Sequence, residues 1–348
     1  MAQGHCCTAA LFFHDDFLLR KNSKNIQSVN QYKPYLHDFW LVDRQRSGWI
    51  SQRHHVTFLS YISKRQGRVL SFPDSSVLQN FPATLHHRNA KIFTAHPIDQ
   101  SAQLAIQKLI DTRQPLQDRV SAPLKGMENN LFAKSQPLDS LRPKLRVTLG
   151  RAKSDGTFDW PVEEVINTLG AQQRGAPVAG LYGFGYRKSA LGLIQEFFIF
   201  TKLLDGYLNG LEWLKQERDI QSLITVSFKL LHALHCKGIV HMDFWANNVM
   251  INLDQPTQAK AIDLENCFLT ASDYLTEVLA FQFGFYYRRE IFRFVIEEEY
   301  DRRVSEEVAK YEGIDRHRFN EMYTLSKHEN ISRRARREIF HKGTVVTG

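Results

Sequence analysis

Four polar residues of one short stretch have the types and the spacing that phosphoryl transfer requires. His241 and Asp243 form an H-x-D triplet, Asn248 follows five positions after the aspartate, and Asp263 comes after a second apolar run. Phosphoryl transfer needs a carboxylate beside the acceptor hydroxyl, and carboxylate and amide oxygens for the Mg²⁺ that bridges the phosphates. The spacing predicts Asp243 as the catalytic base, with His241 bracing the loop backbone. Asp263 and Asn248 are the predicted metal ligands.

The segments around these residues are of the kind that would hold them in place. Apolar residues at helical spacing predict an amphipathic helix over 220–236, which Gly238 ends. Two short apolar strands, 249–253 and 260–264, form a hairpin that brings Asp263 back toward the loop. An alternative reading, in which these polar residues only cap turns and end strands, requires all of these features to coincide by accident.

The chain before this region has a different pattern, with strands around a single helix. Residues 130–134 read as a strand that carries Lys134, and a helix begins after Asp159 and ends near Gly175. Two further strands are predicted over 178–187 and 192–203. Because strands with one helix precede a mostly helical remainder, the predicted fold class is α+β, with a small β-rich lobe followed by a larger helical lobe.

These motifs resemble those of the lipopolysaccharide core kinases, the Kdo/heptose kinase family, a bacterial branch of the protein-kinase-like fold. The resemblance covers about residues 102–300. Asp-Leu-Glu at 263–265, where protein kinases have Asp-Phe-Gly, favours this branch. The motifs that carry it are LFAKSQ at 131–136, TFDWPVEEVINTLGAQQRGAPVAGLYGFG at 157–185, FIFTKLLDGYLNGLEWL at 198–214, HMDFWANN at 241–248 and IDLENC at 262–267.

The resemblance implies ATP and Mg²⁺ as cofactors and a nucleotide site in the small lobe. Lys134 would contact the α- and β-phosphates, and Glu164 on the predicted helix would pair with it. Lys153 and Glu163 are the rival lysine and glutamate. The segment that binds adenine through its backbone would lie near residues 201–204.

The implied acceptor is a sugar hydroxyl of the lipopolysaccharide inner core, a lipid-linked anionic glycan. Residues 1–150 carry 20 basic against 10 acidic side chains, whereas residues 151–348 carry 25 against 27, so the net charge of +8 arises in the first part. That excess suits an anionic acceptor, and an anionic membrane surface as a further partner, although for any one cluster ordinary solvated side chains are the slightly better explanation. No helix-turn-helix, zinc spacing or aromatic RNA-binding motif indicates a nucleic-acid partner.

The expected location is the cytoplasm, with peripheral attachment at the inner face of the cytoplasmic membrane. No signal peptide and no apolar run long enough to span a bilayer are expected. The four cysteines form no metal-binding or disulfide pattern, which fits a reducing compartment.

The predicted organisation is an N-terminal extension of unknown role over 1–100, a kinase-like N-lobe over 101–205 and a helical C-lobe over 206–348. The aromatic segment 281–294 is interpreted as helical core in preference to a membrane-facing helix. The basic tail 333–342 is interpreted either as a contact for anionic lipid or phosphorylated sugar, or as a solvated terminal helix.

One departure keeps other functions open. A loop that covers phosphates needs several glycines, because only a bare backbone approaches phosphate closely, yet Gly126 is the only glycine between residues 105 and 130. A pseudokinase that acts as a binding scaffold is one alternative, and a kinase of proteins or small metabolites is another.

The carboxylate of Asp243 is expected to face the acceptor, so that an asparagine there would leave the stability of the fold unchanged.

Overall fold

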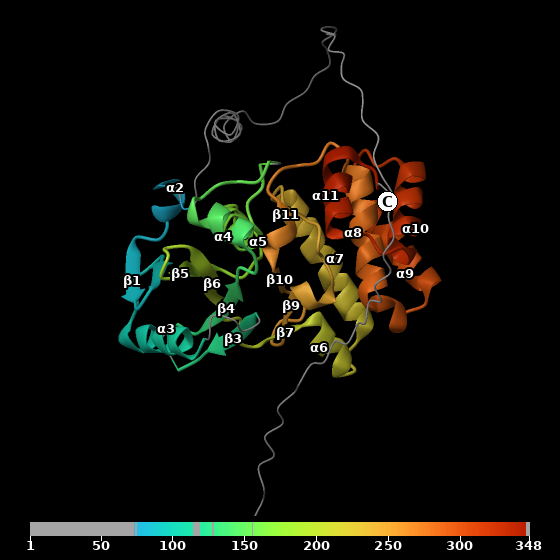
Figure 1. The fold of residues 1–348 in the computed structure, drawn as a ribbon. Helices are drawn as coiled ribbons and strands as arrows, with labels where there is room; N and C mark the ends of the chain where they lie inside the picture. The colour runs from blue at the N-terminus through green and yellow to red at the C-terminus, as the bar shows by residue number, and fades with distance from the viewer. Residues whose placement is uncertain (1–72, 74, 114–118, 127–128, 155, 346–348) are drawn as a thin grey trace, which may run out of the picture. The chain divides into compact units, whose positions relative to one another are not determined.

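A six-stranded antiparallel sheet forms the first part of the fold. The computed structural model describes residues 73, 75–113, 119–126, 129–154 and 156–345, which belong to one compact unit, Leu59–Gly348 (Figure 1). In sheet order the strands are β1 (Ala83–His87), β2 (Ala90–Thr94), β5 (Leu181–Lys188), β6 (Ile194–Lys202), β4 (Leu131–Pro137) and β3 (Val120–Leu124).

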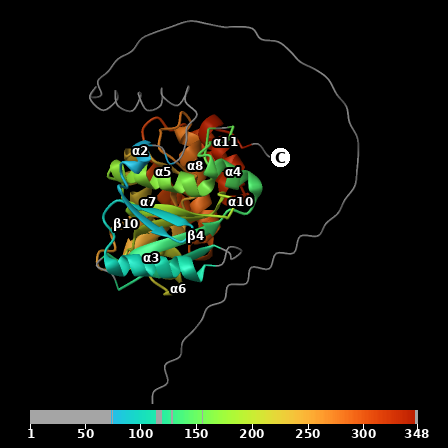
Figure 2. The same ribbon diagram turned by 60° about the vertical axis from the view of Figure 1, so that its left-hand side comes forward.

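Strand β6 is a central strand, and its apolar side chains bury on both faces of the sheet. Phe197 and Ile199 pack toward α5 (Trp160–Gln173), whereas Phe198 and Phe200 pack toward α3 (Gln100–Thr112). Figure 2 shows these two helices on opposite sides of the strands. The alternation follows from the pleat, which directs successive side chains to opposite faces. The sheet is therefore covered by a helix on each side.

The predicted boundary at residue 101 is wrong, because the sheet begins before it. Strands β1 and β2 form a hairpin, and β2 pairs with β5 along its whole length, with Thr94 opposite Gly183. Residues 83–94 therefore belong to the sheet and not to an extension. Of the predicted extension, residues 1–72 lie outside the described residues.

The segment between β4 and α5 is assigned to no helix or strand in the sequence analysis. The structure has a short helix there, α4 (Leu141–Thr148). A four-residue helix, α2 (Ser75–Leu78), precedes the sheet. Only Val147 of α4 is buried, and Pro143 lies within its first turn, so the segment lacks the buried apolar face by which a core helix is recognised. The predicted strands 178–187 and 192–203 are confirmed as β5 and β6.

Helices make up most of the second part of the fold. Two small sheets lie among them. One has three strands, with β9 (Val249–Asn252) between β7 (Tyr207–Asn209) and β10 (Ala259–Ala261), and the other pairs β8 (Val240–His241) with β11 (Cys267–Phe268). The helices are α6 (Gly210–Lys215), α7 (Ile220–Cys236), α8 (Leu275–Arg289), α9 (Glu297–Val308), α10 (Arg316–His328) and α11 (Arg333–Lys342), with single 3₁₀ turns η2 (Ala246–Asn248), η3 (Leu264–Asn266) and η4 (Ile291–Arg293).

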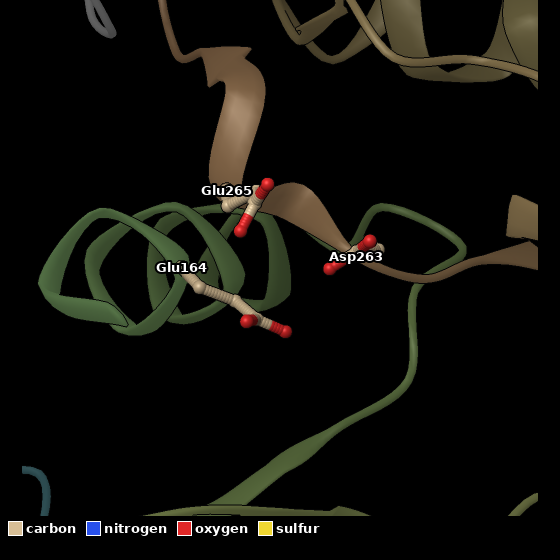
Figure 3. A group of neighbouring side chains, drawn as sticks. All are labelled: Glu164, Asp263 and Glu265. Atoms are coloured by element: carbon tan, nitrogen blue, oxygen red, sulfur yellow. The ribbon is translucent and has the colours of Figure 1, made fainter. Parts of the chain in front are cut away.

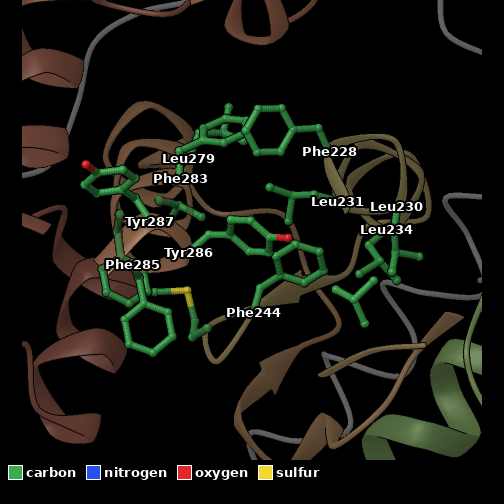
Figure 4. Close-up of a cluster of buried hydrophobic side chains, with 14 of the residues drawn as sticks. Phe228, Leu230, Leu231, Leu234, Phe244, Leu279, Phe283, Phe285, Tyr286 and Tyr287 are labelled. Carbon is green, nitrogen blue, oxygen red and sulfur yellow. The ribbon is translucent and has the colours of Figure 1, made fainter. Parts of the chain in front are cut away.

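The core of this part lies between α7 and α8. Figure 4 shows Phe228 and leucines of α7 against the aromatic residues of α8. The rings of Phe228 and Phe283 meet edge to face at 4.9 Å, and the Tyr286 hydroxyl donates to Ser227 at 2.7 Å. Helical core is therefore the correct interpretation for the first half of the aromatic segment 281–294, while Phe292 and Phe294 are about half exposed.

The α+β, protein-kinase-like fold that the sequence predicts is confirmed. An antiparallel sheet carries Lys134, one helix packed on it carries Glu164, and a helical part with the H-x-D loop follows. No described helix is both long enough and apolar enough to cross a membrane.

Candidate active site

A pocket of about 500 Å³ lies between the sheet and the helical part. Strands β3 and β4 and helix α5 line one side, and the link 201–207 closes one end. The opposite side is lined by Asn248 and Asp263, which follow the H-x-D triplet. This volume is of the size that small-molecule sites have.

Lys134 joins the two sides of this pocket. Its Nζ lies 2.5 Å from Oε1 of Glu164 and 2.9 Å from Oδ1 of Asp263. Glu164 and Asp263 lie 30 and 129 positions from the lysine in sequence, and only the packing of α5 and of the segment after β10 on the sheet brings the three residues together. Figure 3 shows Glu164 on its helix and Asp263 pointing into the same space.

The charges of this cluster support one another. Burial lowers the pKa of the Lys134 ammonium, but the attraction of the Glu164 and Asp263 carboxylates raises it by more. The pKa is therefore above its ordinary value, and the lysine stays cationic. Burial also opposes ionisation of Asp263, yet Lys134, together with Arg119, lowers its pKa on balance. Burial is the largest influence on Glu164 and raises the pKa of its carboxyl. The pocket thus holds a fixed ammonium beside an ionised aspartate.

Asp263 is held in an uncommon backbone conformation. Its φ of 62° and ψ of 59° lie in the left-handed region, which a non-glycine residue adopts only when its surroundings enforce it. The Ile262 amide donates to the Asn248 carbonyl at 3.1 Å, and the Asn167 side chain of α5 donates to the Leu264 carbonyl at 2.9 Å. These bonds on both sides of Asp263 fix the direction of its carboxylate.

The H-x-D loop is tied to the same segment by its own hydrogen bonds. Nε2 of His241 lies 3.1 Å from the Ile262 carbonyl, and Nδ1 accepts from the Asp243 amide at 3.2 Å. Nδ2 of Asn248 donates to the Asp243 carbonyl at 2.9 Å, which leaves the amide oxygen of Asn248 for a ligand. His241 therefore hydrogen-bonds both to its own loop and to the segment that carries Asp263.

The oxygen atoms around Asp263 fit a hard divalent cation. Carboxylate oxygens of Glu164, Asp263 and Glu265 lie within 4.8 Å of one another, and Asn248 lines the same pocket. Mg²⁺ prefers carboxylate and amide oxygens. Glu164 already pairs with Lys134, and Nη1 of Arg333 lies 2.5 Å from Glu265, so Asp263 and Asn248 are the residues that would hold the ion.

The rival residues lie elsewhere. The Glu163 carboxylate accepts from the Phe158 amide at 2.6 Å and so caps the start of α5. Lys153 lies in the link between α4 and α5 and does not line the pocket. The structure brings Lys134 and Glu164 together at the pocket and leaves both rivals outside it.

Sequence reasoning missed two arginines of α11 that contact the predicted base. Nη1 of Arg336 lies 2.7 Å from Oδ1 of Asp243, and the two residues are only 7% and 8% exposed. The Arg336 guanidinium also donates to the Ile331 carbonyl at 3.0 Å and stacks over Phe285 at 4.2 Å. Arg333 is more exposed and lies 3.9 Å from the other oxygen of Asp243.

The sequence does contain a signal for Arg336. Ala335 and Ile339 are four residues apart and buried, as are Arg336 and Phe340, so Arg336 lies on the apolar face of α11. The basic tail is therefore more than a solvated helix or a contact for lipid or sugar, because part of it is packed into the fold. One of its faces is buried in the fold, and that face brings a cation to Asp243.

Arg119 is a further cation that the sequence reasoning missed. It precedes β3, lines the pocket, and lies 3.7 Å from Oδ1 of Asp263. Described residues of and next to β3 that line the pocket are Arg119, Ser121, Pro123 and Lys125. Where a glycine-rich loop would offer backbone amides to phosphates, the residues that flank this strand offer two basic side chains.

Comparisons with solved structures find proteins of related architecture at low identity. A structure described as "WaaP in complex with acyl carrier protein" matches at 15% identity with a TM-score of 0.35, over 62% of this chain and 88% of that chain. A structure of WbdD with the kinase inhibitor LY294002 matches at 18% identity with a TM-score of 0.38, over 61% of this chain and 43% of that chain.

A third match is a divergent kinase that lacks the glycine-rich loop and regulates membrane ultrastructure of the Toxoplasma parasitophorous vacuole. It is 15% identical with a TM-score of 0.40, over 69% of this chain and 90% of that chain. No protein-family model matches the sequence, and no curated protein sequence matches it.

Proposed function

We propose that this protein is an ATP-dependent kinase that transfers the γ-phosphoryl group to a sugar hydroxyl of the lipopolysaccharide inner core. The observation that supports it most is the Lys134–Glu164–Asp263 cluster, which lines the same pocket as Asn248. An ammonium held by a buried glutamate beside an ionised aspartate is the arrangement that binds nucleotide phosphates in this fold.

Each residue of the site has a role in this proposal. Lys134 contacts the α- and β-phosphates, and Glu164 holds the lysine in place. Asp263 and Asn248 would hold Mg²⁺, which would supply positive charge against the transferred phosphoryl group. Asp243 orients the acceptor hydroxyl and accepts its proton, while His241 keeps the loop in register with Asp263.

The identity of the acceptor rests on the resemblance of the motifs, Asp-Leu-Glu at 263–265 above all. The cations beside Asp243 are in keeping with an anionic acceptor, since Arg333 is 62% exposed and lies next to the base. A lipid-linked acceptor places the enzyme at the cytoplasmic face of the membrane in this proposal.

The test is transfer of phosphate by the purified chain. Incubation with ATP, Mg²⁺ and dephosphorylated core oligosaccharide should add one phosphate, seen by mass spectrometry. Asp243→Asn should lower kcat by about 10²–10⁴-fold, the range for loss of a positioned base. Asp273→Asn, an exposed aspartate outside the pocket, is the matched control and should retain full activity.

Two other outcomes identify the alternatives. Transfer to protein or to a small metabolite but not to oligosaccharide would keep the chemistry and replace the acceptor. A pseudokinase scaffold is favoured by one observation, the lack of glycine in β3. ATP binding that is unaffected by Mg²⁺, with no transfer to any acceptor, would support the scaffold and contradict the kinase.

A further inference from the structure

Helix α4 presents a row of leucines to solvent. Leu141, Leu145 and Leu149 are 61%, 41% and 54% exposed, and their spacing of four residues puts them on one face of the helix. The opposite face packs on the sheet through Val147. Single exposed leucines are ordinary, but three in a row on a short helix form an apolar surface that calls for a partner.

A second element adds to this surface at the end of α4. The amide of Ile194, the first residue of β6, donates to the Thr148 hydroxyl at 2.8 Å, which ties the β5–β6 turn to the last residue of the helix. Leu191 lies in that turn and is 88% exposed. We name Leu141, Leu145, Leu149 and Leu191 together the leucine face.

Basic residues surround the leucine face. Arg142, Lys144, Arg151 and Lys188 come from the same two elements and their flanks, and none of them forms an ion pair with another described residue. The remaining arginine of the helix, Arg146, is bound to Asp159. Asp139 is the one described acidic residue in the segment that runs from β4 to residue 154. The rim is therefore strongly positive.

We propose that the leucine face docks this protein on an anionic lipid bilayer. Leucines that enter the acyl boundary, with arginine and lysine at the headgroups, are what binds a short amphipathic helix in the plane of a membrane. An eight-residue helix is far too short to cross, so the protein would lie on the surface. A second copy of the chain is a poorer occupant, because two identical positive rims would repel each other.

This inference goes beyond the proposed function and does not depend on it. Membrane docking needs neither ATP nor an acceptor, so it can be measured on the chain whether or not it transfers phosphate. If both hold, docking would keep the enzyme at the surface that carries a lipid-linked acceptor.

The test is co-sedimentation of the full chain with phosphatidylcholine vesicles that contain or lack phosphatidylglycerol. The chain should bind only the anionic vesicles. Leu141→Ser with Leu145→Ser should weaken this binding by about tenfold or more, since each leucine loses its burial in the acyl boundary. Leu104→Ser is the matched control, because Leu104 is 59% exposed but lies on α3, on the other face of the sheet.

A charge reversal tests the rim separately. Arg142→Glu with Arg151→Glu should abolish binding to anionic vesicles, and both side chains are exposed, so the thermal melt should be unchanged. Leucine variants that bind like the wild type would overturn the proposal, as would equal binding of the wild type to neutral vesicles. If the wild type binds no vesicles and the leucine variants change the oligomeric mass of the chain in light scattering, the leucine face is a protein contact and the proposal is wrong.

Discussion

The ion pair between Arg336 and Asp243 leads to a stability prediction that the sequence would not have suggested. Removal of one partner from a buried pair costs about 3–5 kcal/mol, because the other charge is left buried without its counter-ion. For Arg336→Gln we expect the lower end, about 3 kcal/mol, because Arg333 remains 3.9 Å from the carboxylate. Asp243→Asn should destabilise by a similar amount, since it strands a guanidinium that is 7% exposed.

A double-mutant cycle separates this pairing from general damage. If the cost of each single change comes from the charge left behind, the double variant Arg336→Gln/Asp243→Asn should recover about 2 kcal/mol or more of the summed cost. The assay is urea unfolding of the four proteins with a common m-value. Arg334→Gln is the matched control on the same helix, where a 91% exposed side chain should contribute less than about 0.5 kcal/mol.

Additive costs in this cycle would refute the reasoning, because they would mean that the two side chains do not interact in solution. Unchanged stability of Asp243→Asn would refute it as well. That outcome is what the sequence alone predicts, from the expectation that the carboxylate faces an acceptor. The same variant then serves the transfer assay, provided that activity is measured well below its melting temperature.

Three further predictions concern the pocket and the core. Lys134→Met should lower kcat/KM for ATP by about 10²-fold or more, roughly 3 kcal/mol, while Lys153→Met leaves kcat/KM unchanged. The reverse result would contradict the assignment of Lys134 as the lysine that contacts the phosphates. Asp263→Ala should abolish Mg²⁺-dependent transfer and leave far-UV circular dichroism native, and retained transfer would end its assignment as a metal ligand. Burial lowers the pKa of His235 to about 4 from its ordinary value of 6.5, so the folded chain binds this proton less readily than the unfolded chain. Stability from this group is complete above pH 6.5 and is lost as the pH falls toward 4, so His235→Gln should lose less stability than wild type over that window in urea titrations at each pH.

The H-x-D loop and the Asp263 segment could be predicted because their contacts are local in sequence. His241, Asp243 and Asn248 lie on one loop between a helix and a strand, and the β9–β10 hairpin returns the chain to Asp263. Helical spacing, a glycine stop and two apolar runs are enough to specify such a unit. The fold class followed from the same kind of information, the order of strands and helices.

The hairpin of β1 and β2 could not be assigned to the sheet from its own residues. Two glycines of β5 make room for it: a Cβ on Gly183 would lie 2.4 Å from the Phe93 carbonyl oxygen, and one on Gly185 would lie 2.5 Å from that of Lys91. The glycines were visible in the sequence, but which backbone approaches them depends on a strand pairing about 90 residues away.

The cations around the site were decided by tertiary structure for the same reason. Lys134 could be placed on a strand from its neighbours, but the choice between it and Lys153 required the packing of α5 on the sheet. Arg336 is 93 residues from Asp243, in a basic segment that the sequence assigns either to a contact with anionic lipid or sugar or to a solvated helix. Charge alone does not say which arginine is buried. That depends on which face of α11 the fold covers, and a buried cation then requires an anion, which here is the predicted base.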